Sequence, residues 1–150
     1  MRDGLTMIAR HAILFPLLAY VLLTAIVAVV MYRKRVGEMV ARGIRPQDVA
    51  TAAQMSARLE DTCAADNFRN LFETPLLFVA AVLIVYAAPL TSVLYVTLAW
   101  LYVATGIAHS IIHCSYNKVM HRLRAFLASL IVLWTMWGVL AYDLVIAGKG

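Results

Sequence analysis

Charged residues are absent from three long tracts of the chain, and this pattern predicts most of its architecture. No Asp, Glu, Lys or Arg occurs in residues 11–32, 74–117 or 125–142. A helix needs roughly 20 apolar residues to cross the hydrocarbon core of a bilayer. The first and last tracts therefore each match one membrane-spanning helix, and the middle tract is long enough for two.

The middle tract must fold back on itself to supply two spans. Residues 88–92 read Ala-Pro-Leu-Thr-Ser, in which Pro89 breaks a helix and the polar residues favour a turn. Because lipid offers the backbone no hydrogen-bond partner, each span must be a helix. We therefore predict an all-α membrane protein, a single four-transmembrane-helix bundle over residues 1–150, with spans at approximately 11–32, 70–88, 93–115 and 122–142.

The first connection, approximately residues 33–65, is polar. We expect the first span to end at the basic run 33–35, followed by a short linker in which Gly37 is the first helix breaker. Asp48 is a candidate N-cap for a long helix that continues into the second span. Pro75 should kink this helix, because its ring clashes with the carbonyl group four residues earlier.

Composition and charge refine this picture. The chain is 63% hydrophobic and only 14% charged, and its 13 Lys and Arg against 8 Asp and Glu give a net charge of +5. This excess is small, so we predict the lipid bilayer, and no nucleic acid, as a partner. The basic residues gather in segments 33–69 and 118–124. The positive-inside rule then places both segments in the cytoplasm and both termini outside it.

A first polar cluster lies where the second span begins. Arg69, Asn70 and Glu73 are three or four residues apart and share one side of a helix. Ionised side chains at such a depth normally face a partner or a wet cavity. The cluster is therefore either a ligand-facing site or a local ladder of ion pairs, in which Arg69 pairs with Asp66 and with Glu73.

A second cluster lies at the end of the third span. His109, His113, Asn117 and His121 recur every four residues, which would place them on one helical stripe. Two His at this spacing can bind a metal ion, but no Cys or carboxylate follows at ligand spacing, so we predict no metal. Hydrogen bonding between helices and ligand binding remain the two alternatives for this stripe.

A third cluster begins the fourth span. We interpret Lys118 and Arg124 as anchors at the membrane surface. Arg122 differs, because it lies one helical turn before Phe126 on an otherwise apolar helix and can point inward. We predict that Arg122 lies at the same membrane depth as the polar end of the second span.

These motifs resemble a known family, the membrane-associated proteins in eicosanoid and glutathione metabolism (MAPEG). The resemblance covers most of the chain, includes the four-span layout and is nearest to bacterial members, so a bacterial inner membrane is expected. It depends on the residues that enter the second span and those that leave the third, Phe68-Arg69-Asn70-Leu71-Phe72-Glu73-Thr74-Pro75 and His109-Ser110-Ile111-Ile112-His113-Cys114-Ser115-Tyr116-Asn117-Lys118, and on Arg122.

The resemblance implies a homotrimer that binds glutathione as a co-substrate between neighbouring subunits, on the cytoplasmic side. By position, Arg122 resembles the arginine that stabilises the glutathione thiolate, and it is the implied catalytic residue. The implied glutathione-binding residues are Arg69, Asn70, Glu73, His109, His113, Tyr116 and Asn117.

Three positions depart from the pattern of many catalytic members. Asp66 and Gly106 stand where an Arg is common, and Phe126 stands where some members have a Tyr. The leading hypothesis is a membrane-bound glutathione-dependent transferase or peroxidase that acts on a lipophilic electrophile or hydroperoxide. The alternative, which these departures favour, is a non-catalytic lipid-binding or scaffold member of the same fold. A channel or transporter is disfavoured, because the spans lack a carboxylate at the membrane centre.

Overall fold

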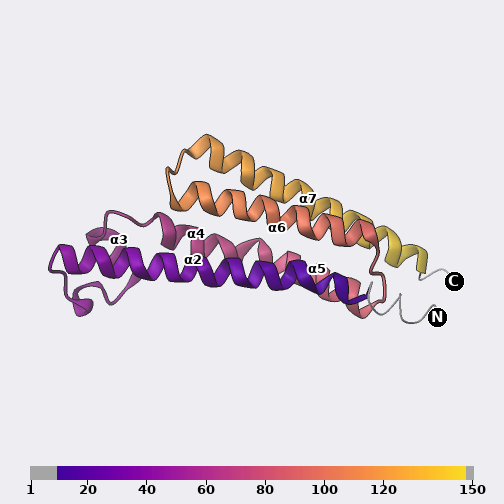
Figure 1. The fold of residues 1–150 in the computed structure, drawn as a ribbon, viewed down its shortest axis with the longest axis horizontal. Coiled ribbons are helices and arrows are strands. Elements are labelled where there is room, and N and C mark those ends of the chain that lie inside the picture. The colour runs from indigo at the N-terminus through magenta and orange to yellow at the C-terminus, as the bar shows by residue number, and fades with distance from the viewer. Residues whose placement is uncertain (1–9, 148–150) are drawn as a thin grey trace.

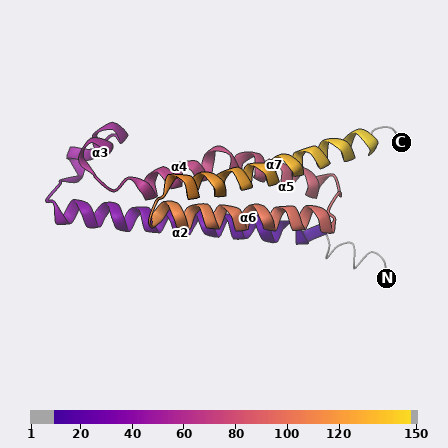
Figure 2. The same cartoon turned by 90° about the horizontal axis from the view of Figure 1, so that it is seen from above.

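Four long helical segments run side by side along one axis (Figures 1 and 2). The computed structural model describes residues 10–147, and this part of the chain contains no β-strand. The predicted all-α four-helix bundle is confirmed. The helices are α2 (Leu14–Ala41), α4 (Cys63–Glu73), α5 (Pro75–Ala87), α6 (Val93–Cys114) and α7 (Val119–Ala147), with a short 3₁₀ helix η1 (Pro46–Val49) and α3 (Ala52–Arg58) between α2 and α4.

Each of the four segments is long and apolar enough to cross a membrane, with α4 and α5 together forming one of them. The protein is therefore an integral, multi-pass membrane protein. The start of α2 and the end of α7 lie at one end of the bundle, which we call the terminal end (Figure 1). The opposite end carries α3, the start of α4 and the α6–α7 turn, and we call it the basic end.

The core at mid-length is built from closely packed aromatic rings. The ring of Phe78 lies 4.4 Å from that of Tyr102 and 5.7 Å from that of Tyr20, measured between centroids. Three buried side chains of α7, those of Leu133, Met136 and Leu140, complete the core. Rings at such separations add favourable contacts to the burial of apolar area, so this layer holds α2, α5 and α6 together.

The break between α4 and α5 follows from Pro75. Proline has no N–H group, so the carbonyl oxygen of Leu71 loses its helical donor. The buried hydroxyl group of Tyr20 donates to this oxygen across 3.4 Å instead. A side chain from α2 thus satisfies the group that the proline leaves without a partner, as a buried backbone carbonyl requires.

The connection between α2 and α4 differs from the sequence-based expectation. The first helix does not stop near residues 33–35 but continues through Gly37 to Ala41. A glycine inside a helix costs only about 1 kcal/mol. Glu38 offsets this cost, because it pairs with Arg42 at 2.7 Å and accepts the backbone N–H of Glu60, also at 2.7 Å.

The expected long helix from Asp48 into the second span is also wrong. Asp48 lies in η1 and pairs with Arg45. The N-cap is Thr51, which forms a reciprocal capping box with Gln54 at the start of α3. The chain then leaves helical geometry at Leu59, which is extended, before α4 begins.

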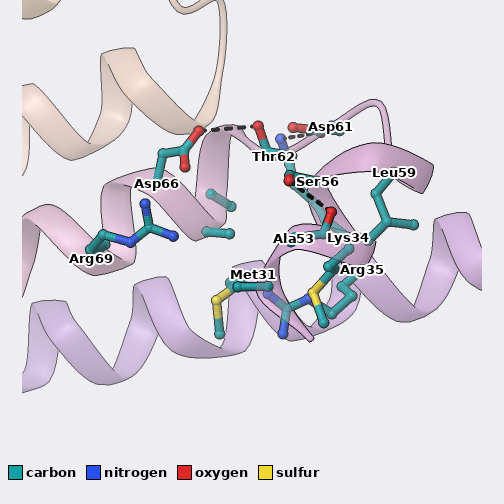
Figure 3. A pocket seen from close by; sticks show the side chains of 14 residues that line it. Met31, Lys34, Arg35, Ala53, Ser56, Leu59, Asp61, Thr62, Asp66 and Arg69 are labelled. Atoms are coloured by element: carbon teal, nitrogen blue, oxygen red, sulfur yellow. Dashed lines mark hydrogen bonds and ion pairs between the residues drawn. The ribbon is translucent and has the colours of Figure 1, made fainter. Parts of the chain in front are cut away.

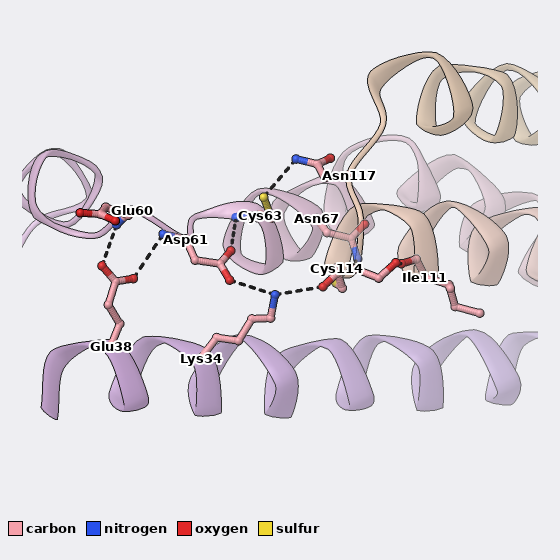
Figure 4. Close-up of polar contacts among 10 residues, drawn as sticks. Lys34, Glu38, Glu60, Asp61, Cys63, Asn67, Ile111, Cys114 and Asn117 are labelled. Carbon is pink, nitrogen blue, oxygen red and sulfur yellow. Dashed lines mark hydrogen bonds and ion pairs between the residues drawn. The ribbon is translucent and has the colours of Figure 1, made fainter. Parts of the chain in front are cut away.

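Lys34 of α2 contacts both the segment before α4 and the end of α6 at the basic end (Figure 4). Its ammonium group donates to Asp61 Oδ2 and to the carbonyl oxygen of Cys114, both at 2.9 Å. The hydrogen bond from Lys34 lowers the pKa of Asp61, although partial burial opposes this effect. Both Cys63 and Cys114 are free thiols.

Candidate functional site

The α6–α7 turn is shaped by Asn117. Its φ angle of 45° is left-handed, a conformation that asparagine tolerates better than most residues. Its N–H donates to the carbonyl oxygen of Ile112 at 2.9 Å, which closes the end of α6. The predicted four-residue stripe is therefore wrong beyond His113, because α6 ends at Cys114 and His121 belongs to α7.

Arg122 is held by neutral partners. Its Nη1 atom donates to Asn117 Oδ1 at 3.0 Å and to His113 Nε2 at 3.2 Å. A guanidinium group can only donate, so His113 Nε2 acts as an acceptor and its imidazole is neutral. Arg122 forms no ion pair within residues 10–147, so its positive charge remains available for an anion.

The two histidines of α6 both lie against Arg122. The rings of His109 and His113 meet edge to face, with centroids 5.6 Å apart. His109 Nδ1 lies 3.2 Å from the carbonyl oxygen of Arg122, to which it donates. His109 Nε2 and His113 Nδ1 are buried and have no hydrogen-bond partner in the described residues. Each histidine therefore uses one ring nitrogen in a hydrogen bond between helices and leaves the other without a partner in the described residues.

A cavity of about 290 Å³ opens where α4, α6 and α7 meet. It brings together predicted site residues from three helices that are far apart in the sequence. Its lining residues are Asn70, Glu73, Thr74, His109, Val119, Arg122, Leu123 and Phe126. The cavity therefore combines one guanidinium group, one carboxylate, one amide, one imidazole and one hydroxyl group with apolar side chains.

Arg69 lies elsewhere, in a second cavity of about 410 Å³ between α2, α3 and α4 (Figure 3). The alternative ladder of ion pairs does not form, because Arg69 contacts neither Asp66 nor Glu73 as an ion pair. Asp66 instead accepts a hydrogen bond from the hydroxyl group of Thr62 at 3.0 Å. Helix α4 thus presents different polar residues to two different cavities.

The remaining candidates lie at the edge of this region. Tyr116 is exposed, and its hydroxyl group lies 3.2 Å from His121 Nδ1. The side-chain NH₂ group of Asn117 donates to the sulfur atom of Cys63 at 3.0 Å, which links the turn to α4. Within residues 10–147, no three His, Cys, Asp or Glu side chains are grouped so that they could hold a metal ion.

Sequence reasoning missed Thr74, Val119 and Leu123 as cavity-lining residues. Helical spacing was the available signal for Thr74, which lies four residues after Asn70. For Val119 and Leu123 the sequence carries no such signal, because both look like any other apolar residue of a span.

Gly106 has a packing role. A Cβ atom added there would lie 3.6 Å from the ring of Tyr20 and 3.8 Å from a methyl group of Leu23. A small residue fits this contact, as is common where membrane helices approach closely.

The fold and the cavity define a class of protein: a four-helix integral membrane protein with an arginine-containing polar pocket at one end. The profile of the MAPEG family matches residues 13–142, and the chain belongs to that family. This membership places it among membrane proteins of glutathione-related transferase, peroxidase or lipid metabolism. No curated protein and no solved structure matches the chain.

Proposed function

We propose that the protein is a glutathione-dependent transferase or peroxidase that acts on a lipophilic electrophile or hydroperoxide. The observation that carries this proposal is the position of Arg122. Its guanidinium group lines the cavity beside Asn70 and Glu73, and its own partners, His113 and Asn117, are neutral. These partners orient Arg122 without neutralising it.

Arg122 is suited to stabilise a thiolate. A free thiol has a pKa of about 8.5, and a cation nearby lowers it. Arginine keeps its charge at all relevant pH values and offers several donors. When the glutathione thiol binds beside Arg122, its proton leaves to water and the thiolate remains as the nucleophile.

The thiolate then has two possible acceptors. With an electrophile, sulfur forms a bond to carbon and the leaving group departs with its electron pair. With a hydroperoxide, sulfur takes the terminal oxygen, the O–O bond breaks, and the alkoxide gains a proton to become an alcohol. A second glutathione then reduces the sulfenic acid, which yields the disulfide and water. The apolar side chains of Val119, Leu123 and Phe126 suit an acceptor that arrives from the lipid.

The charges of the cavity fit glutathione only in part. Glu73 is suited to the ammonium group of the peptide and Asn70 to its amide groups. Glutathione carries two carboxylates, however, and Arg122 is the one cation among the described residues that line this cavity. We propose that an adjacent subunit of a homotrimer supplies further donors, with Arg69, Tyr116 and Asn117 at the boundary.

The direct experiment combines purified protein, glutathione and either an aryl halide or a lipid hydroperoxide. We expect turnover together with an ultraviolet thiolate absorbance that appears well below the pKa of free glutathione. The absence of both signals would remove the proposal.

The alternative is a non-catalytic lipid-binding or scaffold protein of the same fold. Asp66 places a negative charge in the cavity beside Arg69, and Phe126 contributes no hydroxyl group to the cavity at Arg122. Tight lipid binding that does not depend on any thiol, without turnover, would favour this alternative.

We also propose how the protein is oriented. The basic segments gather at the basic end, so the positive-inside rule places that end in the cytoplasm and both termini outside, in a bacterial inner membrane. The proposed spans are 11–32, 70–88, 93–115 and 122–142, with 33–65 as the cytoplasmic connection. Labelling of an introduced cysteine at position 45 from the cytoplasmic side alone is the expected result.

A further inference from the structure

The two cysteines of the chain, Cys63 and Cys114, lie 51 positions apart in the sequence and are brought to the same place by the fold. Cys63 is the first residue of α4, and Cys114 is the last residue of α6. These two helices pack against each other. Both cysteines are free thiols and both are partly exposed, so each can react with a small molecule.

A single ion pair holds the backbone of both cysteines (Figure 4). The ammonium group of Lys34 donates to the carbonyl oxygen of Cys114 and to Asp61 Oδ2, each at 2.9 Å. The other carboxylate oxygen of Asp61 accepts the backbone N–H of Cys63 at 3.2 Å. The pair of Lys34 and Asp61 therefore fixes the start of α4 against the end of α6.

The side chains form a second link between the same two segments. Cys63 Sγ accepts a hydrogen bond from the amide of Asn117 at 3.0 Å, and Cys114 Sγ accepts one from the amide of Asn67 at 3.5 Å. Cys63 and Asn67 are one turn apart and share a face of α4. Cys114 and Asn117 both belong to the end of α6 and its turn. The two sulfur–amide contacts therefore lie side by side between the two segments.

The backbone around both thiols can adjust. A disulfide requires Cα atoms within about 7 Å of each other. Cys63 follows residues 59–62, which are not helical, and Cys114 is followed by the α6–α7 turn. Such helix ends open more readily than helix interiors. Cys114 also gives up little when it leaves Asn67, because that contact is long and a sulfur atom is a weak acceptor.

We propose that Cys63 and Cys114 are a redox-active pair that forms a disulfide by exchange with a small-molecule disulfide such as glutathione disulfide. Cys114 packs against the hydrophobic core, so Cys63 reacts first. Its thiolate attacks one sulfur atom of the small disulfide and releases one thiol. The thiolate of Cys114 then attacks the sulfur atom of Cys63 and releases the second thiol. The protein loses two electrons and two protons, and the two released thiols gain them.

The surroundings favour a reversible disulfide over a metal site or a permanent crosslink. Within residues 10–147, no three His, Cys, Asp or Glu side chains are grouped for a metal ion, so the two thiols lack further ligands. The proposed orientation places the pair in the cytoplasm, where disulfides are usually transient and redox-sensing. The pair is therefore suited to act as a switch.

The disulfide acts on Arg122 through Asn117. In the reduced protein, the amide of Asn117 donates to Cys63 and accepts from Arg122 at 3.0 Å. Disulfide formation withdraws the sulfur atom of Cys63, so the turn loses this contact with α4 and Asn117 holds Arg122 less firmly. Formation of the disulfide does not depend on the proposed function, whereas its effect on turnover does.

Peptide mapping of the purified full-length protein tests the pair directly. The protein is incubated with glutathione disulfide, the remaining thiols are blocked with iodoacetamide, and the peptides are identified by mass spectrometry. We expect both free thiols to be lost and one linked peptide to contain both cysteines of a single chain, with recovery of both thiols in dithiothreitol. Unreacted thiols, separate glutathione adducts on both cysteines, or disulfides between chains on a non-reducing gel would overturn the proposal.

Two conservative variants test the order of the steps. Cys114→Ser should retain glutathione on Cys63, because the second exchange cannot occur. Cys63→Ser should lose the reaction with glutathione disulfide, because the remaining thiol packs against the core. Ready addition of glutathione to Cys114 in Cys63→Ser, with none to Cys63 in Cys114→Ser, would contradict the proposed order.

Turnover before and after oxidation tests the link to Arg122. We expect kcat/KM of the wild type to fall about tenfold on oxidation, the equivalent of one hydrogen bond to a charged group, and to recover in dithiothreitol. Cys63→Ser is the matched control, because its hydroxyl group can still accept from Asn117 but cannot form a disulfide. Its turnover should not respond to the oxidant, and equal losses in both proteins would overturn the link.

Hydrogen–deuterium exchange keeps this test separate from the proposed function. Exchange in residues 115–122 should accelerate on oxidation of the wild type and stay constant in Cys63→Ser. If the reduced protein shows no turnover but forms the disulfide with this change in exchange, only the proposed function fails. Unchanged exchange in the oxidised wild type would overturn the link between the cysteine pair and Arg122.

Discussion

The two ends of the bundle treat their polar groups differently. At the terminal end, charged side chains have partners: Tyr95 donates to Asp143 at 2.7 Å, and the guanidinium group of Arg10 lies 4.8 Å from the ring of Tyr86. The basic end contains all the ion pairs found in residues 10–147, but none of them includes Arg35, Arg69 or Arg122. Charge at the terminal end stabilises the fold, whereas the basic end combines stabilising ion pairs with three arginines whose charge is available to ligands.

Buried polar atoms show the same contrast. The described buried side-chain atoms without a hydrogen-bond partner are Asn67 Oδ1, His109 Nε2, Ser110 Oγ and His113 Nδ1. All belong to α4 and to the last turns of α6, near the basic end. Native proteins rarely leave such atoms unsatisfied. Their concentration beside both cavities indicates that stability is lower there than it would be with apolar residues, as is common at functional sites.

The largest expected effect comes from Arg122→Ala. If Arg122 stabilises the thiolate, its removal should raise the pKa of bound glutathione by about 1–2 units and reduce turnover at neutral pH by about 10–100-fold. Arg124→Ala, which removes a neighbouring exposed cation, should leave turnover nearly unchanged. Measured kcat/KM values and thiolate absorbance check this prediction, and equal losses in both variants would contradict it.

At the terminal end, Tyr95→Phe should reduce stability and spare activity. The buried hydroxyl group of Tyr95 donates to a carboxylate, and hydrogen bonds to charged groups contribute about 1.5–3 kcal/mol. Tyr142→Phe is the control, because Tyr142 is exposed. Thermal unfolding and turnover are measured on both variants. A loss of turnover without a loss of stability would show that the terminal end contributes to activity rather than to stability.

Asn67→Leu should have the opposite effect on stability. Asn67 is fully buried, its Oδ1 atom has no partner, and its amide makes only a 3.5 Å contact with the sulfur atom of Cys114. Replacing such a group by an apolar one of similar shape should stabilise the fold by about 1 kcal/mol. A midpoint of chemical unfolding that falls would show that Asn67 has a partner in the assembled protein.

The smallest expected effect concerns pH. Because the pKa of Asp61 in the folded protein is below its ordinary value of 3.8, the Lys34–Asp61 pair stabilises the fold above that pH and is lost as the pH falls through the lowered value. Wild type should therefore lose slightly more stability on acidification than Asp61→Asn. Unfolding midpoints at about pH 6 and pH 3 check this, and identical losses would contradict it.

The sequence predicted the fold well and the site in part. Uncharged tracts identified four helices, because a lipid environment leaves the backbone few alternatives. Helical spacing could not assign Arg69 to its cavity, since Arg69 and Asn70 are adjacent on α4 and yet line different cavities. The stripe of residues 109–121 failed at Asn117, because a left-handed residue ended the helix there.

The sequence by itself determined that the chain crosses a membrane as helices and that its ionised groups lie toward the ends of the spans. Hydrophobicity and charge act locally, so both can be read without knowing which helices are neighbours. Only the tertiary structure decided that Arg122 is held by His113 and Asn117, and that Arg35 and Arg69, 34 positions apart in the printed sequence, line one cavity. Such contacts depend on how helices pack across the bundle, which no local pattern specifies.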